Sequence, residues 1–177
     1  MCIVQTKSGL KVTLREAVEN DAKEMIEFYN VVGGETTYLS FCEGEYRMSE
    51  EDQANSIKNT NESDNNTMIL AEVDSKIIGI GTISSNQKKK GKHVGILGIV
   101  IKEEFCDAGL GRLIMEYLID WCKGNKITTK ISLVTAEDNP RALALYKKCG
   151  FEVEGILKNE TYIDGKYFNL VSMGLIL

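Results

Sequence analysis

The chain has 177 residues, of which 43% are hydrophobic, and a formal net charge of −5. This length is typical of one domain, which would bury about 70% of the surface that its unfolded chain exposes. We therefore predict a single domain over residues 1–177. The acidic balance argues against nucleic acid as the main partner and favours a cationic substrate over an anionic one.

The cysteines and the hydrophobic pattern predict whether the protein has disulfides, a metal site or a membrane helix, and in which compartment it lies. The 5 cysteines are widely spaced and form no Cys-x-x-Cys pair, so the sequence predicts neither a disulfide framework nor a metal site. No stretch reaches the roughly 18 continuous apolar residues of a membrane helix, and residues 1–10 lack the pattern of a signal peptide. We therefore expect a cytoplasmic protein without membrane contact.

The N-terminal part predicts a strand followed by a helix. Residues 10–16 have the pattern of a strand. Asp21, with Glu24 three positions later, predicts the N-terminal cap of an amphipathic helix, and Gly33-Gly34 predicts its end. The apolar side chains that this helix would turn inward are Met25, Ile26, Phe28, Tyr29 and Val32.

The next segments predict a short helix and three strands. Ser49 with Asp52 has the pattern of a helix start, and the few apolar residues that follow predict a peripheral helix. Residues 67–73 and 77–84 are strand-like and are joined by a polar turn, which predicts an antiparallel hairpin. A third strand over residues 93–101 follows a lysine-rich loop, which we interpret as solvated.

The most informative stretch follows this third strand. Gly109-Leu110-Gly111-Arg112 opens a helix with one apolar stripe and one charged face. Glycines at a helix start let the backbone turn tightly and leave the first N–H groups free, which favours a bound phosphate. The sequence therefore predicts a site for a phosphorylated cofactor, although an ordinary tight turn would use the same residues. The apolar stripe consists of Leu110, Leu113, Ile114, Tyr117, Leu118 and Trp121.

The C-terminal part predicts one further helix between strands. A strand near residues 131–135 precedes Asn139-Pro140, a strong helix opening because asparagine caps well and proline at the first helical position has no N–H to lose. Gly150 would end this helix, and residues 151–157 and 167–175 have the pattern of strands. Together these elements predict a mixed α/β sheet with helices on its faces.

Three motifs resemble those of a known family. Ile99-Val100-Ile101, residues 105–112 and residues 139–151 resemble, in order and spacing, the acetyl-CoA motifs of the GNAT N-acetyltransferase superfamily. Residues 15–17 and 21–22 resemble the first strand and helix of that family, so the resemblance covers nearly the whole chain. It implies an acetyl-CoA-dependent enzyme whose largely antiparallel, twisted sheet is splayed at the cofactor site and flanked by about four helices.

The resemblance also implies roles for individual residues. The strand edge would pair with the pantetheine arm, the glycine loop would hold the pyrophosphate through its N–H groups, and Asn139 would bind the pantetheine. Tyr146 would be the general acid that returns a proton to the departing thiolate. The residues alone leave Asn139 open as a plain cap and Tyr146 as a core tyrosine. The implied cofactor-binding residues are Ile99, Val100, Ile101, Asp107, Ala108, Gly109, Leu110, Gly111, Arg112 and Asn139.

Two positions of the glycine loop depart from the family pattern. Cys106 stands where the family usually has Gln or Arg, and Asp107 stands where glycine is common. The loop therefore loses a polar side chain and gains a negative charge near a negative ligand. We expect weaker cofactor binding, with Arg112 or Lys102 offsetting part of the added charge.

The strand before the loop leaves two questions open. Its glycines, Gly95 and Gly98, mark either a bulge where the sheet splays or simple interruptions of the strand. Related enzymes often place a general base at positions that hold Ile96 and Val134 in this chain. The other candidates for the base are Glu43, Glu72, Glu137 and His93, which we interpret as exposed surface residues. Water could also accept the proton.

The favoured function is transfer of an acetyl group from acetyl-CoA to a primary amine of a small molecule, by direct attack. Glu35, Glu43 and Glu45, which follow the first helix, are candidates for attracting the amine. Two other functions stay open, namely acetylation of a protein N terminus or lysine, and a non-catalytic acetyl-CoA-binding sensor or interaction module. A homodimer is a further hypothesis that rests on fold-level analogy.

Overall fold

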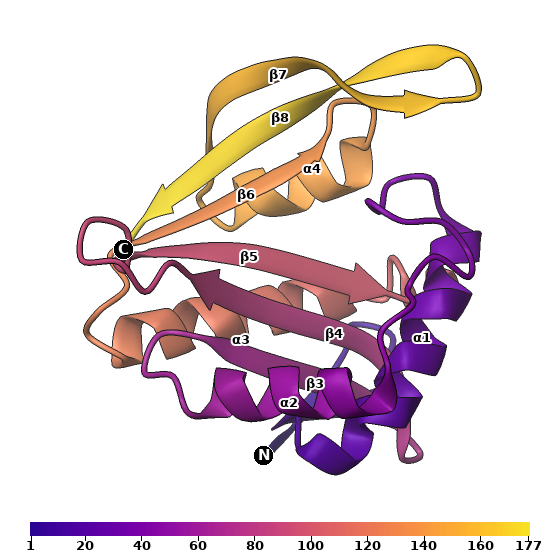
Figure 1. The fold of residues 1–177 in the computed structure, drawn as a ribbon, viewed down its shortest axis with the longest axis vertical. Coiled ribbons are helices and arrows are strands. Elements are labelled where there is room, and N and C mark those ends of the chain that lie inside the picture. Colours follow the sequence, from indigo (N-terminus) through magenta and orange to yellow (C-terminus); the bar gives the residue numbers. More distant parts are fainter.

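The computed structural model describes residues 1–177 and joins all strands into one sheet (Figure 1). The strand order is β1-β2-β3-β4-β5-β6-β8-β7, and all neighbours are antiparallel except β5 and β6. The predicted mixed, largely antiparallel sheet is therefore confirmed. The strands are β1 (Cys2–Gln5), β2 (Lys11–Glu16), β3 (Thr67–Val73), β4 (Lys76–Ser85), β5 (Val94–Ile101), β6 (Lys130–Ala136), β7 (Glu152–Ile163) and β8 (Lys166–Ile176). The helices are α1 (Ala22–Glu35), α2 (Glu50–Asn61), α3 (Leu110–Gly124) and α4 (Pro140–Lys148), with short 3-10 turns η1 (Glu19–Asp21) and η2 (Glu103–Phe105).

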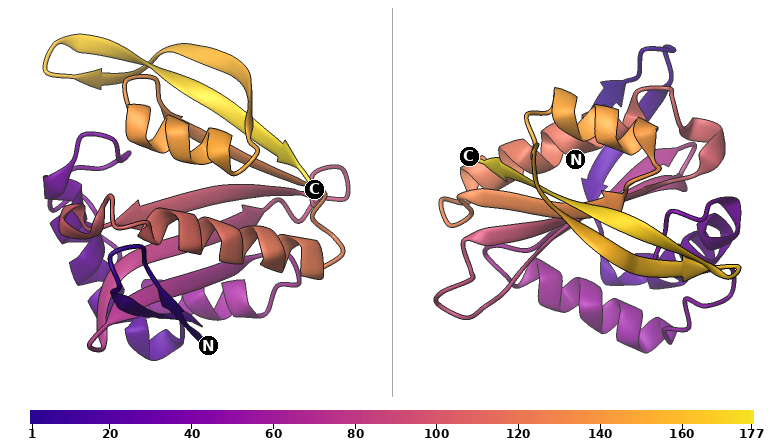
Figure 2. Two further views of the ribbon diagram at one scale, coloured as in Figure 1. Left: turned by 180° about the vertical axis from the view of Figure 1, so that it is seen from behind. Right: turned by 90° about the horizontal axis from the view of Figure 1, so that it is seen from above.

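Helices cover both faces of the sheet, and each face has its own apolar core (Figure 2). On one face, Met25 of α1 and Ile57 of α2 are fully buried against β3 and β4. On the other face, Ile114 and Leu118 of α3 belong to a larger buried cluster, against which α4 packs. Removal of these side chains from water is the main favourable contribution to folding. None of the helices is long and apolar enough to cross a membrane.

Several structures predicted from local sequence signals are present. Ser49 Oγ accepts a hydrogen bond from the N–H of Asp52 at 3.0 Å, which caps α2 as expected. The hairpin of β3 and β4 turns at Asp74 and Ser75, which have φ of 49° and 60°. Two successive residues with positive φ are typical of the tight turns that match the twist of paired strands.

Asp21 stands at the N-cap position of α1, as predicted, but its expected capping bond is absent, and the predicted end at Gly33-Gly34 is wrong. The Asp21 carboxylate makes no capping bond to the helix and instead accepts hydrogen bonds from Arg15. Gly33-Gly34 does not end the helix, which continues to Glu35. A Cβ atom on Gly33 would lie 2.8 Å from the carbonyl oxygen of Cys42. This glycine therefore lets the following loop pack closely on the helix, and it does not act as a helix breaker.

The structure contains more strand than the sequence predicts. The short strand β1 pairs with β2 and is mostly exposed, so no hydrophobic alternation marks it. The strands β7 and β8 extend beyond the predicted ranges to a turn at Asp164-Gly165. Most of β7 is exposed on both faces, and without a buried face no alternation of two residues is imposed on its sequence.

The strands β5 and β6 separate soon after they meet. They pair from Val94–Lys130 to Ile96–Ser132, after which β5 keeps only β4 as a neighbour and β6 keeps only β8. Figure 1 shows the two strands diverging from the end that lies near the C terminus. The splayed sheet that the family resemblance implies is therefore present, and we call this gap the fork.

The two glycines of β5 do not mark a bulge. The ladder between β4 and β5 keeps its register from Gly79–Ile101 to Ser85–Gly95. A Cβ atom on Gly95 would lie 2.8 Å from Cγ2 of Ile83, and one on Gly98 would lie 2.8 Å from Oγ1 of Thr82. Both glycines therefore make room for side chains of the neighbouring strand.

Candidate functional site

The edge of β5 that faces the fork is unpaired. The N–H of Lys102 donates to the carbonyl of Ile78 on β4 at 3.1 Å, and main-chain groups alternate in direction along a strand, so those of Val100 also face β4. The N–H and C=O groups of Ile99 and Ile101 therefore point into the fork. An extended ligand with amide groups can bind such an edge in the manner of an added strand.

The loop between β5 and α3 presents a run of free N–H groups. From Asp107 to Arg112, no backbone N–H donates to an acceptor in the chain, and the first helical bond runs from Leu113 to the carbonyl of Gly109 at 3.4 Å. These groups lie at the N-terminal end of α3, where the helix dipole favours an anion. We call residues 107–112 the phosphate loop, because their geometry suits a phosphate group.

Close packing joins the phosphate loop to the fork and to α4. Gly109 has φ of +88°, a conformation that favours glycine. A Cβ atom on Gly111 would lie 3.1 Å from Cδ2 of Leu145 and 3.4 Å from Cδ1 of Ile101. The start of α3, the edge of β5 and the middle of α4 therefore meet at Gly111. Leu145 directly precedes Tyr146, so the helix that carries this tyrosine packs beside the phosphate loop and the edge of β5.

The negative charge of Asp107 is balanced by a residue that the sequence did not indicate. Nη1 of Arg141, near the start of α4, lies 3.5 Å from Oδ2 of Asp107, and its Nη2 lies 3.2 Å from Oε1 of Glu103. The expectation that Arg112 offsets this charge is not met, because its Nε pairs with Glu116 at 2.7 Å. Asp107 is therefore less unfavourable to an anion than its charge alone implies.

Cys106 has the properties of a structural thiol. Burial raises the pKa of this cysteine, an effect that the nearby Arg141 guanidinium opposes. The thiol therefore stays protonated at neutral pH, whereas nucleophilic cysteines have a lowered pKa.

Tyr146 combines a packed ring with an accessible hydroxyl. The ring lies 6.0 Å from that of Phe151, centroid to centroid, and packs against the core beneath α4. No group of the chain hydrogen-bonds to the hydroxyl. The only buried side-chain polar atom without a partner is Oδ1 of Asn30, so the Tyr146 hydroxyl is accessible to solvent. Burial of the side chain raises the pKa of Tyr146 to about 12, with a smaller effect of Cys149 in the same direction. The phenol thus keeps its proton and has it available for donation.

Asn139 caps α4 and keeps a donor free. Its Oδ1 accepts a hydrogen bond from the N–H of Ala142 at 3.1 Å. The two N–H bonds of its side-chain nitrogen have no partner in the chain, so capping and ligand binding use different atoms of this residue.

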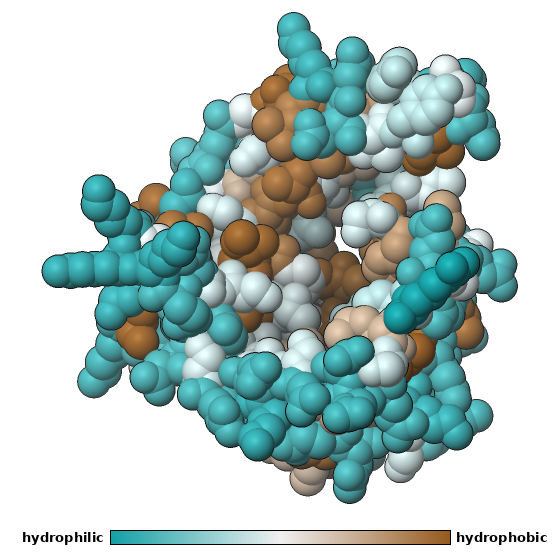
Figure 3. All heavy atoms as spheres, in the orientation of Figure 1, coloured by the Kyte–Doolittle hydropathy of each residue, from teal (hydrophilic) through white to brown (hydrophobic).

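Apolar side chains line the face of the fork that lies opposite α3. Leu97 and Leu133 point into the core beneath α3, so their neighbours Ile96 and Val134 point to the other face. These two side chains are 58% and 50% exposed. The space-filling view shows a hollow at the centre of this face, with apolar and neutral residues inside and polar residues around the rim (Figure 3). We call it the acceptor hollow.

The loop of residues 36–49 closes one end of the acceptor hollow. The hydroxyl of Tyr38 donates a hydrogen bond to the carbonyl of Asp138 at 3.1 Å, which joins this loop to the turn between β6 and α4. The contact spans 100 positions of sequence, so no local pattern indicates it.

The carboxylates that the sequence singled out are mostly engaged elsewhere. Glu72 pairs with Arg15 on the neighbouring strand, and Glu137 accepts a hydrogen bond from Asn169 at 2.8 Å. His93 is exposed and precedes the closed end of the fork. Glu35 accepts a hydrogen bond from the N–H of Glu103 at 2.8 Å, so it braces the segment before the phosphate loop. Glu72, Glu137 and Glu35 are therefore committed to bonds within the protein.

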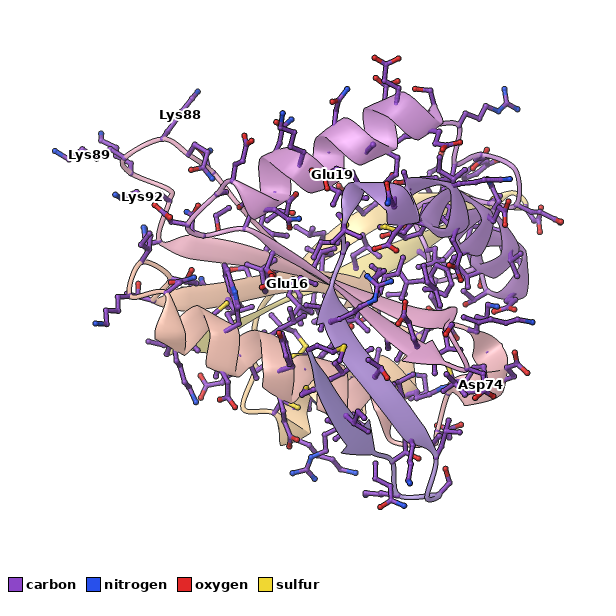
Figure 4. All side chains as sticks on the ribbon, turned by 90° about the horizontal axis from the view of Figure 1, so that it is seen from below. Glu16, Glu19, Asp74, Lys88, Lys89 and Lys92 are labelled. Atoms are coloured by element: carbon purple, nitrogen blue, oxygen red, sulfur yellow. The ribbon has the colours of Figure 1, made fainter.

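A separate polar cavity of about 430 Å³ lies away from the fork, between the ends of β2, α2 and α3. Glu16, Asp64 and Trp121 are among its lining residues. Figure 4 shows Glu16 on this side of the molecule, and it shows Lys88, Lys89 and Lys92 extending from the exposed loop between β4 and β5. The lysine-rich loop is thus exposed, as predicted. Neither feature includes a residue of the fork or the phosphate loop.

Comparison with known proteins identifies the family. Residues 34–151 match the family model described as acetyltransferase (GNAT) family. A crystal structure of a GNAT family acetyltransferase from Streptococcus pneumoniae is 33% identical and superimposes with a TM-score of 0.92, covering 94% of this chain and 99% of that one. The chain therefore belongs to the GNAT family of acetyltransferases.

Curated relatives share part of the sequence. The L-amino acid N-acetyltransferase AaaT of Escherichia coli (strain K12) is 31% identical over 104 residues, which are 56% of this chain and 64% of that protein. A spermidine N(1)-acetyltransferase of Vibrio cholerae is 33% identical over 78 residues, which are 44% of this chain and 45% of that protein. The chain thus aligns with less than two thirds of the length of each.

Proposed function

We propose that the protein transfers an acetyl group from acetyl-CoA to the primary amine of a small molecule. The observation that carries this proposal is the junction at Gly111, where a free strand edge, a run of free N–H groups and the Tyr146 helix meet. These parts fit the ligand, because acetyl-CoA has an amide-bearing arm, a pyrophosphate and a thioester. When bound, it supplies an activated acetyl group and a thiol leaving group.

In this proposal the main-chain groups of the site bind acetyl-CoA and orient it. The N–H and C=O groups of Ile99 and Ile101 hold the pantetheine amides, and the free side-chain nitrogen of Asn139 donates a further hydrogen bond to the same arm. The phosphate loop holds the pyrophosphate through its N–H groups and the dipole of α3. Members of the family usually have Gln or Arg at the position of Cys106. This chain lacks that polar side chain, so main-chain donors contribute more of the binding.

Tyr146 supplies the proton for the leaving group. Because its pKa is raised to about 12, its Oη holds a proton at neutral pH. As negative charge develops on the sulfur, the hydroxyl donates a hydrogen bond and then its proton to the thiolate, and the phenolate recovers a proton from solvent, so the hydroxyl serves as general acid.

The amine enters from the acceptor hollow and loses its proton to water. An attacking amine must be neutral, and an alkylamine has a pKa of about 10.4 in water. The apolar side chains of Ile96 and Val134 disfavour the ammonium form, and the carboxylates of Glu72, Glu137 and Glu35 are engaged in other bonds. Water in the open hollow is therefore the acceptor, and the protein contributes mainly desolvation and position.

Three observations support a small amine as the substrate. The hydrogen bond between Tyr38 and Asp138 closes one end of the hollow, which suits a pocket better than a groove for a peptide. The relatives named above acetylate an amino acid or spermidine, and the acidic charge of this chain also favours a cationic substrate. Two features favour the alternative of a non-catalytic acetyl-CoA sensor: Cys106 in the phosphate-binding segment, and Ile96 and Val134 at the positions where related enzymes often have a general base. With all five cysteines free, we place the protein in a reducing cytoplasm.

The test is release of free thiol from acetyl-CoA in the presence of polyamines, amino acids, aminoglycosides and short peptides. Turnover with one class of small amine supports the proposal, and turnover with peptides alone would assign a protein substrate. Binding of acetyl-CoA by calorimetry without turnover on any amine would assign the sensor function. No binding and no turnover would refute both.

A further inference from the structure

The turn between β1 and β2 lies beside the phosphate loop. Figure 2 shows the tip of this N-terminal hairpin next to the start of α3. A Cβ atom on Gly109 would lie 3.5 Å from Cγ and 3.8 Å from Cδ of Lys7. The stem of the lysine therefore passes Gly109, the residue immediately before α3. A strand that no sequence pattern marked thus brings a cation to the candidate cofactor site.

The backbone of this turn is well ordered by its own hydrogen bonds. The N–H of Thr6 donates to the carbonyl of Leu10 at 2.9 Å, and the N–H of Gly9 donates to the carbonyl of Thr6 at 3.0 Å. The hydroxyl Oγ1 of Thr6 accepts a third bond, from the N–H of Leu10 at 3.1 Å. Thr6 is only 5% exposed, so the residue before Lys7 is anchored. A fixed backbone lowers the entropy lost when the lysine binds a ligand.

The charge of Lys7 is not engaged within the protein. Lys7 is exposed and forms no ion pair, whereas Arg112 pairs with Glu116 and Arg141 pairs with Asp107 and Glu103. Both arginines near the phosphate loop thus have part of their charge balanced by carboxylates. An anion at the start of α3 would meet an unbalanced positive charge on Lys7.

We propose that Lys7 binds a phosphate group of acetyl-CoA and that the hairpin of β1 and β2 forms one wall of the cofactor site. This inference rests on the proposed function, because it needs acetyl-CoA to occupy the phosphate loop. The ligand carries two kinds of phosphate, a pyrophosphate and a 3′-phosphate, and the experiment distinguishes which of them Lys7 contacts.

The test is calorimetric titration of acetyl-CoA into wild-type protein and into the variants Lys7→Gln, Lys7→Arg and Lys11→Gln. Lys11 is the matched control, because it is an exposed lysine of the same hairpin at the other side of the turn. We expect Lys7→Gln to raise the Kd about fivefold, as for loss of one exposed charge interaction, and this difference to shrink in about 0.5 M salt. Lys7→Arg and Lys11→Gln should stay within about twofold of wild type.

A second titration with 3′-dephospho-CoA identifies the phosphate. If the effect of Lys7→Gln disappears with this ligand, Lys7 binds the 3′-phosphate, and if the effect persists, Lys7 binds the pyrophosphate. Equal Kd values for acetyl-CoA in wild type and Lys7→Gln would overturn this inference and leave the proposed function intact. Failure of wild type to bind acetyl-CoA would overturn both.

Discussion

Oδ1 of Asn139 accepts the capping hydrogen bond from the N–H of Ala142 at 3.1 Å, while the nitrogen of the same side chain has no partner in the chain. The sequence left open whether this residue caps α4 or binds the cofactor. The geometry allows both roles at the same time, because they use different atoms. The two roles can therefore be separated by substitution.

Asn139→Asp keeps the capping oxygen and removes the free donor. We expect its free energy of unfolding to stay within about 0.5 kcal/mol of wild type, while its Kd for acetyl-CoA rises several-fold. Asn139→Ala should also lose about 1 kcal/mol of stability, because the cap is gone. Urea unfolding and calorimetry measure the two effects. Wild-type affinity in Asn139→Asp would show that this residue is a cap alone.

Removal of the Tyr146 hydroxyl tests the general acid. In Tyr146→Phe we expect kcat to fall by at least about tenfold, the lower part of the range for general acid catalysis, with the Kd for acetyl-CoA unchanged. The ring keeps its packing against Phe151, so folding should be unaffected. Tyr162→Phe, which changes an exposed tyrosine of β7, is the control. An unchanged kcat in Tyr146→Phe would assign this residue to the core.

The pH dependence of kcat/KM tests the account of proton transfer. A group with a raised pKa keeps its proton at all pH values below that pKa, so Tyr146 stays an acid up to a pH of about 12. The acceptor amine becomes neutral only near its own pKa of about 10.4. We therefore expect kcat/KM to rise with pH and to show no falling limb below a pH of about 10. A bell-shaped profile centred near neutral pH would indicate a general base that this account lacks.

Arg15 of β2 forms ion pairs with two mostly buried carboxylates, those of Asp21 before α1 and Glu72 of β3. Its Nη1 lies 2.7 Å from Oδ2 of Asp21, and its Nη2 lies 2.5 Å from Oε1 of Glu72, with both carboxylate side chains 12% exposed. Burial raises the pKa of Asp21, but hydrogen bonds from Arg15 and from the N–H of Val18 outweigh it, and the pKa is lowered overall. We expect Arg15→Gln to destabilise the protein by about 2 kcal/mol at pH 7, because it leaves unpaired charges.

This loss should depend on pH in a defined direction. A carboxylate with a lowered folded-state pKa contributes stability above its unfolded-state pKa of 3.8 and loses that contribution as the pH falls below it. The difference between wild type and Arg15→Gln should therefore shrink in acid, as measured by urea unfolding at pH 7 and in the acid range. Arg47→Gln, at an exposed arginine outside any ion pair, is the control. An equal difference at both pH values would contradict the assignment.

The elements that the sequence predicted well are those with complete local signals. The helix α4 has an asparagine cap, a proline in its first turn and a glycine after its end, all of which depend on neighbouring residues. The predicted apolar stripe of α3 is partly confirmed: Leu110, Ile114 and Leu118 are buried, but Met115, Ile119 and Cys122 also belong to the buried face and Leu113 does not. By contrast, β1 has no buried face to impose a pattern, and Gly33 serves a contact with Cys42, which lies outside its own helix.

In the candidate site, too, features that depend on local sequence were predictable and contacts between distant segments were not. The phosphate loop depends on the local start of a helix, so its sequence was sufficient to predict its free N–H groups. The pairing of Arg141 with Asp107, the closure by Tyr38 and the position of Lys7 all join segments that are distant in sequence. Such contacts depend on how the elements pack, and no periodicity or capping motif encodes them.

A crystal structure of the protein with bound CoA tests the central claim most directly. The account predicts that the pantetheine arm lies in the fork, hydrogen-bonded to the main chain of Ile99 and Ile101, and that the phosphates accept N–H bonds from the phosphate loop at about 2.9 Å. It also predicts that Oη of Tyr146 lies within hydrogen-bond distance of the CoA sulfur. CoA bound away from the fork, or with its sulfur out of reach of Tyr146, would contradict the account.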